Sequence, residues 1–481
     1  MTRRSLAWMA PLLVTFGCTV GPDFRPPLPP ADGPYTRDRA TRTAVADETS
    51  QRFVDGMDVS ATWWRFLGCP ALDSVVGRAL AANPGLESAR ATLRRSYDSL
   101  QAGYGVFFPQ IDAHASASRQ LYNPAPGVLP SSTFNLVTLS GTVSYTVDVW
   151  GGARRQTEVL RAAVDSQRYA LAAARVMLTS NVVNAVVAQA AYRAEIDATR
   201  GMLVLLQEQA RIASAQAAAG TAPYANVLGI RAQVASTAAT LPALEQKIDQ
   251  AADLLAALTA TMPAAWDQPP VRLSDLHVPP DVPLSLPSQL VRQRPDVLIA
   301  EEELRAANAG IGVATAAMLP NITLTGGAGV GGSSVGDLFG PGAAFWNVGA
   351  GLLAPVFHGG ALHYQRRAAI DARDAAAAAY RQSVLAAFEQ VADTLAALSH
   401  DADAVAAQSE AVETAEEAMR LVQANYQAGV ATYVQVIVAD VQYLQAKIAQ
   451  VQATAQRLQD TVALYVALGG GWWRAPDDLH G

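Results

Sequence analysis

Charged side chains are scarce in this sequence. Only 16% of its 481 residues are charged, whereas 51% are hydrophobic, and alanine occurs in long runs. The formal net charge is −7, and no basic stripe is present that could neutralise a phosphate backbone, which argues against a nucleic-acid partner. Alanine-rich, weakly charged sequence with helical periodicity is typical of long helices in close contact rather than of one thick core.

Residue sets for catalysis or metal binding are also missing. No Ser/His/Asp or Cys/His set can be assembled, and His358 and His363 share no metal-type spacing with another His or Cys. The glycine-rich segment 326–332 lacks the G-x-G-x-x-G spacing and no helix opens after it, so a loop or a glycine-rich strand is predicted instead of a dinucleotide site. We therefore predict a protein that is not an enzyme and has no cofactor or metal site.

Cysteine is almost absent, and the two that occur differ in context. Residues 1–17 resemble a secretory signal peptide. Their apolar run, 6–16, is too short to be a membrane-spanning helix. Cys18 follows directly, which is the acceptor pattern of a bacterial lipoprotein; the alternative is a buried cysteine or a disulfide with Cys69. Thr19 stands where an aspartate would retain a lipoprotein in the inner membrane. The pattern predicts covalent lipid, including palmitate, on Cys18 and sorting to the outer membrane.

The sequence repeats itself at long range. Pro84 recurs as Pro295, and Pro109 recurs as Pro320. Each proline is 211 residues from its counterpart. Such a unit is far longer than the roughly 20–50 residues of a solenoid repeat. We predict two tandem structural repeats, and divide the chain into a signal peptide (1–17), an acylated extended tether (18–60), a first repeat (61–270), a second repeat (271–470) and a C-terminal tail (471–481).

Period-two alternation predicts β-strands in both repeats. Residues 137–149 alternate without a fault between apolar or small and polar side chains, and residues 111–118 do the same. The second repeat has a shorter alternating run at 322–325 and another around Trp346. Each repeat therefore contributes one hairpin, about 106–149 and about 320–358, for four strands in all.

Proline is missing from two long helical stretches, 152–219 and 360–428. At 1.5 Å per residue each helix would be on the order of 100 Å long. The second stretch carries apolar residues at steps of seven, namely Val384, Val391, Leu398, Val405, Val412, Met419 and Tyr426. A shorter heptad-patterned helix follows each one, so helix pairs are predicted over about 152–262 and about 360–468, packed as coiled coils. Pro242 is expected to cause a local bend.

Four strands are too few to close a membrane barrel, for which about eight is the minimum, and open sheet edges are not tolerated in lipid. The apolar strand faces nevertheless favour lipid. Three protomers would supply twelve strands to one shared barrel and twelve helical segments to a tube. The predicted fold class is mainly α with a β-barrel part.

Several segments resemble a known family. Trp63-Trp64 with Leu72, the proline-terminated repeat segments and the opening Cys18–Phe24 are similar to TolC-like outer-membrane efflux proteins, and the opening to their NodT/OprM-type lipoprotein branch. The resemblance covers about 18 to 470. It implies a homotrimer with an outer-membrane β-barrel and a periplasmic α-barrel. It also implies a periplasmic adaptor (membrane fusion) protein and an inner-membrane RND transporter, which together export drugs or other toxic small molecules and confer antibiotic resistance.

The same resemblance implies a docking tip at the two helix turns. It places Gly220 and Thr221 in the first repeat, and Gly429 and Val430 in the second, where the adaptor's helical hairpin binds. Glycine permits positive φ and close approach by a partner helix. The alternative is a pair of ordinary turn glycines, and their recurrence in both repeats favours the docking interpretation.

A periplasmic gate is implied just beyond the tip. Family members often carry an acidic ring six residues after the glycine, but here those positions hold Asn226 and Gln435. Tyr426 matches a position that keeps the tip closed. The nearest acid is Asp440, about a turn and a half beyond Gln435.

Two other functions stay open at this point. The chain could be the outer-membrane conduit of a protein secretion system, which uses the same family fold. It could also be a structural periplasmic coiled-coil lipoprotein without a pore, although the alternating strands argue against that.

An uncharged gate lacks the electrostatic focusing that a carboxylate ring provides, so we expect weak cation selectivity and little block by multivalent cations. Single-channel recordings of Gln435→Asp should show new sensitivity to divalent cations. An unchanged response would place the gate elsewhere.

Overall fold

The computed structural model describes residues 19–28, 33–36, 42–45, 50–123, 131–267 and 271–474. The predicted signal peptide, Cys18 and most of the C-terminal tail lie outside these residues. The chain divides into two compact units. The first comprises residues 1–26, 94–166 and 300–380, and the second comprises residues 27–93, 167–299 and 381–481.

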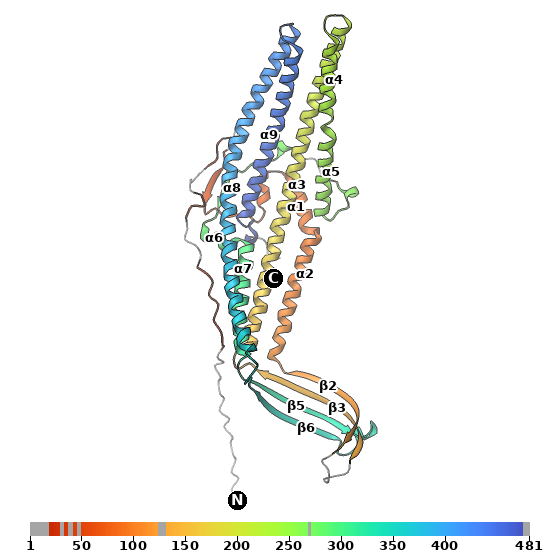
Figure 1. Ribbon diagram of the computed structural model, residues 1–481, viewed down its shortest axis with the longest axis vertical. Helices are drawn as coiled ribbons and strands as arrows, with labels where there is room; N and C mark the ends of the chain where they lie inside the picture. The colour runs from red at the N-terminus through yellow and green to blue at the C-terminus, as the bar shows by residue number, and fades with distance from the viewer. Residues whose placement is uncertain are drawn as a thin grey trace. The chain divides into compact units, whose positions relative to one another are not determined.

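The first unit contains one antiparallel sheet of four strands (Figure 1). The strands, in sheet order, are β2 (Gln110–Tyr122), β3 (Ser132–Val147), β5 (Asn321–Gly332) and β6 (Ala344–Leu353). The two predicted hairpins are therefore present, and β3 pairs with β5 to join them. The glycine-rich segment 326–332 is part of β5, which confirms a strand in that place, and a short 3₁₀ turn, η5 (Gly336–Phe339), follows it.

The register of this sheet places apolar or small side chains on one face and mostly polar or small side chains on the other. Val143 of β3 lies opposite Ile111 of β2 and Gly326 of β5, which in turn faces Val348 of β6. Because side chains alternate between the two faces of a sheet, all residues of such a row lie on the same face. The rows on this face contain only apolar or small residues from Val137 to Val147 of β3.

The rows between them are mostly polar or small, and the exception is Phe345 of β6, which lies in the row of Ser140 and Gly329. Asp112, Thr142, Gly327 and Asn347 form one such row across the four strands. Another row on this face pairs Ser116 with Thr138, whose hydroxyl oxygens are 2.7 Å apart. One face of the sheet is thus apolar and the other hydrophilic.

Two helices of equal length follow the hairpins. They are α3 (Gly152–Ala218) and α8 (Ala361–Gln427), each of 67 residues, so the predicted length on the order of 100 Å is confirmed. Among the described residues α3 is the one helix apolar and long enough to cross a membrane, but 61% of its most apolar 18-residue window is buried inside the protein. The helices that precede the two hairpins are α2 (Pro84–Tyr104) and α7 (Pro295–Ala316). A 3₁₀ turn, η2 (Gly105–Phe107), follows α2.

The second unit adds shorter helices. These are α1 (Pro70–Ala82), α4 (Tyr224–Ala238), α5 (Leu241–Leu258), α6 (Pro287–Gln293), α9 (Tyr433–Ala467) and the 3₁₀ segments η1 (Trp63–Leu67), η3 (Pro263–Ala265), η4 (Leu273–Asp275) and η6 (Trp472–Arg474).

One pair of strands was not predicted. β1 (Arg52–Asp55) pairs in parallel with β4 (Asp281–Leu284), so the segment expected to be an extended tether up to residue 60 ends in regular structure. Gln51, just before β1, is fully buried and donates its Nε2 hydrogen to Thr461 of α9 at 3.2 Å. Strands of four residues carry too little alternation to be recognised by periodicity.

The heptad prediction is confirmed along α8 and is partly wrong in α9. Val391, Leu398 and Val405 of α8 are fully buried. In α9 the heptad pattern, which begins with the pair Val434 and Ile437, predicts Val434 on the packed seam. Val434 is instead 66% exposed, whereas Tyr433, Val436 and Asp440 are buried. A straight α-helix has 3.6 residues per turn and drifts by about 20° per heptad, so the buried face moves away from a strict period of seven.

Pro242 interrupts the predicted helix, as expected, but by a break between α4 and α5. Proline has no N–H with which to continue the helical hydrogen bonds. Thr240 supplies hydrogen bonds at the break: its N–H and its hydroxyl both donate to the carbonyl of Thr237, at 3.2 and 2.8 Å. The two segments therefore meet at an ordered interruption.

The end of α9 depends on a run of glycines with positive φ. Gly471 has φ 67°, and a Cβ atom there would collide with the carbonyl oxygen of Ser60. We expect Gly471→Ala to lower the unfolding free energy by about 2 kcal/mol, because both the left-handed backbone and the close approach exclude a side chain. Thermal unfolding of the purified protein measures this. Gly77→Ala in α1, where nothing lies within 4 Å, is the control and should be neutral or stabilising; equal losses in both variants would contradict the explanation.

Candidate functional site

The two predicted tip turns have the same backbone structure. Gly220 and Gly429 both lie in the left-handed region, with φ 72° and 74°. In the first turn the N–H groups of Gly220 and Thr221 donate to Ala217 and Gln216; in the second, those of Gly429 and Val430 donate to the residues at the same spacing. This pair of hydrogen bonds is the Schellman ending of a helix, in which glycine takes the left-handed position.

Apolar side chains surround these turns without being buried by the chain itself. Val430 is 78% exposed, and Tyr224 and Leu228 of α4 and Val434 of α9 are more than half exposed. A Cβ atom on either turn glycine would meet nothing within 4 Å. The surface at the turns is therefore open and apolar, as a partner helix would require.

Tyr426 of the predicted gate lies near the end of α8, just before Gly429 of the second turn. Its hydroxyl donates to Oε1 of Gln216 on α3 at 3.0 Å, and its ring packs on a cluster of Ala213, Val227, Ile230 and Tyr433. Tyr426 therefore links α8, from the second half of the chain, to α3, from the first. Its place in the structure is compatible with a role in holding the helix ends together.

Gln435 has a local structural role. Its Oε1 accepts hydrogen bonds from the backbone N–H of Thr432 at 2.7 Å and from the Thr432 hydroxyl at 3.0 Å, while its own N–H donates to the Thr432 carbonyl. This capping box begins α9. Asn226 is half-buried in the first turn of α4, and among the described residues no hydrogen bond joins Asn226, Tyr426 and Gln435 to one another.

Asp440 is buried inside the helical unit, and sequence reasoning gave it no role. It is 1% exposed, and its two carboxylate oxygens accept hydrogen bonds from Nε2 of Gln209 on α3 (2.8 Å) and Nε2 of Gln423 on α8 (2.9 Å). Burial raises the pKa of Asp440, and the two amide donors oppose that change in part. This carboxylate thus links α3, α8 and α9 through hydrogen bonds near the turns.

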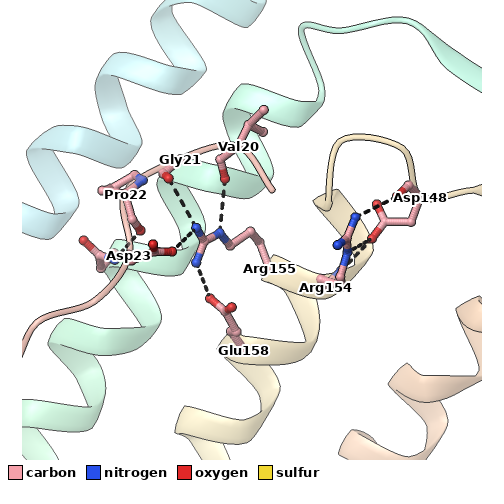
Figure 2. Close-up of polar contacts among 9 residues, drawn as sticks. Val20, Gly21, Pro22, Asp23, Asp148, Arg154, Arg155 and Glu158 are labelled. Atoms are coloured by element: carbon pink, nitrogen blue, oxygen red, sulfur yellow. Dashed lines mark hydrogen bonds and ion pairs between the residues drawn. The ribbon is translucent and has the colours of Figure 1, made fainter. Parts of the chain in front are cut away.

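A second group of charged residues lies in the first unit, at the start of α3. Asp148 accepts hydrogen bonds from the N–H groups of Ala153 and Arg154, both at 3.1 Å, and so caps the start of α3. Figure 2 shows this cap beside Arg155, whose guanidinium points instead toward residues 20–23 of the N-terminal segment. Thr19 separates those residues from the predicted lipidation site, Cys18, which lies outside the described residues.

Metal binding finds no support at these places. Within the described ranges no group of three or more His, Cys, Asp or Glu residues is close enough to hold a metal ion. His358 and His363 are exposed, and Cys69 is a free cysteine at the start of α1.

The buried charge of Asp440 gives a testable pH dependence. Because burial raises the pKa of Asp440 in the folded state, the folded protein binds a proton more readily than the unfolded chain. This group therefore favours folding as the pH falls from neutrality toward the ordinary aspartate pKa of about 4. Asp440→Asn removes the buried charge, so thermal unfolding should respond less to pH over that range. The exposed Glu413→Gln on α8 is the control; an Asp440→Asn protein with an unaltered pH response would show that this carboxylate does not contribute.

Known proteins resemble the chain over nearly its whole length. The family model for outer membrane efflux proteins matches residues 75–261 and 286–470. The chain is 31% identical over 416 residues to the pyoverdine export outer membrane protein OpmQ of Pseudomonas aeruginosa, covering 85% of this chain and 87% of that protein. It is 27% identical over 485 residues to the probable efflux pump outer membrane protein TtgC of Pseudomonas putida, covering 98% and 96%. The outer-membrane channel OprN has a similar structure, with a TM-score of 0.85 at 26% identity over 95% of this chain and 100% of OprN. The chain belongs to the outer membrane efflux protein family.

Proposed function

We propose that three copies of this chain form one conduit, in which their sheets join edge to edge into a twelve-stranded outer-membrane barrel. The observation that carries this proposal is the sheet itself, with its continuous apolar face, its polar opposite face and its two open edges.

The open edges require partners. β2 and β6 are the outer strands of the sheet, and every residue of both is exposed. In a hydrocarbon environment each unpaired backbone N–H or C=O costs several kcal/mol, so a sheet is stable there only when its edges are closed. Joining β6 of one copy to β2 of the next closes the ring, and three copies supply more than the minimum of about eight strands.

The two faces then have different environments. The apolar rows face the lipid, and the polar rows, which include Asp112, Thr142 and Asn347, line a water-filled interior. Small polar or amphiphilic molecules can pass through such an interior. A periplasmic coiled-coil protein without a pore would have no use for this separation of faces.

The helices extend the conduit into the periplasm. In this proposal the turns at Gly220-Thr221 and Gly429-Val430 receive the helical hairpin of a periplasmic adaptor protein, and the exposed apolar side chains around them form its docking surface. The adaptor connects the conduit to an inner-membrane RND transporter, and Asn226, Tyr426 and Gln435 lie at the entrance. A lipid on Cys18 anchors each copy to the outer membrane.

The substrates in this proposal are drugs or other toxic small molecules. The names of the relatives, a pyoverdine export protein and a probable efflux pump protein, support this class of cargo. Deletion of the gene followed by drug-susceptibility profiling identifies which compounds the system exports.

The orientation of the sheet is tested by two neighbouring residues. Leu139 lies on the apolar face and Ser140 on the polar face of β3. Leu139→Lys should prevent assembly in the outer membrane, since a lysine facing lipid at mid-depth costs about 2–4 kcal/mol per chain. Ser140→Lys should assemble normally and reduce the cation conductance of the channel in planar bilayers.

Outer-membrane yield and single-channel conductance measure the two effects. The opposite result, with Ser140→Lys lost and Leu139→Lys tolerated, would reverse the assignment of the faces. A purified, unsubstituted protein without channel conductance would contradict the conduit.

A further inference from the structure

The N-terminal segment is held in the first unit by one buried arginine. The side chain of Arg155, on the first turn of α3, is 3% exposed. Figure 2 shows its guanidinium facing the segment. Its Nε donates to the Val20 carbonyl at 3.1 Å, and its Nη2 donates to the Gly21 carbonyl at 3.2 Å and to the Asp23 carboxylate at 2.7 Å.

The remaining guanidinium nitrogen, Nη1, donates to Glu158, one turn along α3, at 2.8 Å. The planar fork of an arginine can serve two carbonyls and two carboxylates at once, which the single ammonium of a lysine cannot do with the same geometry. Asp23 is 89% exposed and Glu158 45%, so the carboxylates face water while the cation between them is buried.

Other elements bind the same segment. The N–H of Val20 donates to the carbonyl of Trp150, which follows β3, at 3.0 Å, and Nδ2 of Asn308 on α7 donates to the carbonyl of Pro22 at 2.9 Å. The Arg305 guanidinium, also on α7, lies 5.0 Å from the centre of the Phe24 ring. Residues 20–24 are therefore fixed from two helices and the end of a strand.

Glycines make this close approach possible. A Cβ atom on Gly312 of α7 would lie 2.6 Å from Cγ of Arg155 and 2.9 Å from the Val20 carbonyl oxygen. A Cβ on Gly151 would lie 2.8 Å from Cγ2 of Thr19. Real Cβ contacts are not this short, so the absence of a side chain at these glycines leaves the space that the N-terminal segment occupies.

Arg155 has no counterpart in the second half of the chain. The motif at Arg161–Asp165 recurs at Arg367–Asp371, and at that spacing the residue that corresponds to Arg155 is Ala361. The position that corresponds to Arg155 therefore has no guanidinium, although the two halves otherwise follow the same order of strands and helices.

We propose that Arg155 is a positioning residue that clamps residues 20–23 against α3 and α7, and so limits how far an acyl group on the preceding Cys18 can move from the protein. Consecutive Cα atoms are about 3.8 Å apart, so fixing Thr19 and Val20 restricts where a lipid on the preceding residue can reach. The lipid is then attached to an ordered segment rather than to a loose tether. This inference rests on the proposed lipidation of Cys18.

Spin labelling tests the clamp in the full-length protein reconstituted in liposomes. A nitroxide at Arg25→Cys, an exposed position at the end of the segment, is introduced in a Cys69→Ser background. With Arg155 intact, the label should be restricted and should have one depth, measured from its relative accessibility to oxygen and to a water-soluble nickel chelate. Arg155→Gln should increase its mobility several-fold and broaden its depth, and Arg155→Lys should restore part of the order.

A matched pair of variants separates the clamp from general stability. Asp23→Asn and Glu158→Gln each remove one carboxylate partner of the same guanidinium, but only Asp23 belongs to the segment. Asp23→Asn should loosen the label clearly more than Glu158→Gln. Equal order in the Arg155→Gln, Asp23→Asn and unsubstituted proteins would overturn the proposal.

The lipid is tested separately by mass spectrometry of the N-terminal peptide. We expect acylated Cys18 in all these variants. A peptide without lipid in the unsubstituted protein would refute the anchor, and with it the clamp's role in placing a lipid, whereas ordered residues 20–23 that depend on Arg155 would still establish the clamp itself.

Discussion

A backbone hydrogen-bonding group cannot be left unpaired in the hydrocarbon of a membrane, and the rest of this structure follows from that constraint. The sheet has four strands in the order β2-β3-β5-β6, and its outer strands have no neighbour on their far sides among the described residues. Its rows of side chains are sorted so that one face is apolar and the other polar. A sheet with these properties belongs in lipid but is incomplete in a single chain. Assembly from several copies is therefore a requirement of the sheet rather than an addition to it.

The two halves of the chain repeat the same order of elements but are not equivalent. Both contain a hairpin, a helix of 67 residues and a turn with a left-handed glycine. Besides the pairing of β3 with β5, side-chain hydrogen bonds between helices link the halves, among them Tyr426 with Gln216 and Asp440 with Gln209. Arg155 holds the N-terminal segment in the first half, and the corresponding position of the second half is Ala361. The repeated strands and helices provide the architecture, and these polar side chains add hydrogen bonds between them.

Long periodic elements could be predicted from the sequence, and single contacts could not. The alternation over 137–149 located β3 (Ser132–Val147) to within a few residues, and proline-free stretches located α3 and α8. The tandem duplication and the roles of the tip and gate residues stay predictions. β1 was missed because four residues show no period, and the burial of Asp440 was missed because it depends on how far the α9 seam drifts from seven. The role of Gln435 had a readable signal, since Thr432-x-x-Gln435 is a capping-box pattern, whereas the Arg155 contacts depend on segments more than 130 residues apart.

The closed ring of sheets can be tested by cross-linking the two open edges. In a Cys69→Ser background, Val348→Cys on β6 is combined in turn with Ala113→Cys, Ala115→Cys or Ala117→Cys on β2, all on the apolar face. If three copies join edge to edge, at least one pair should form disulfides in outer membranes and give bands of two and three chains on a non-reducing gel, with none larger. A protein that stays monomeric for every pair, or that forms a ladder beyond three chains, would contradict the account.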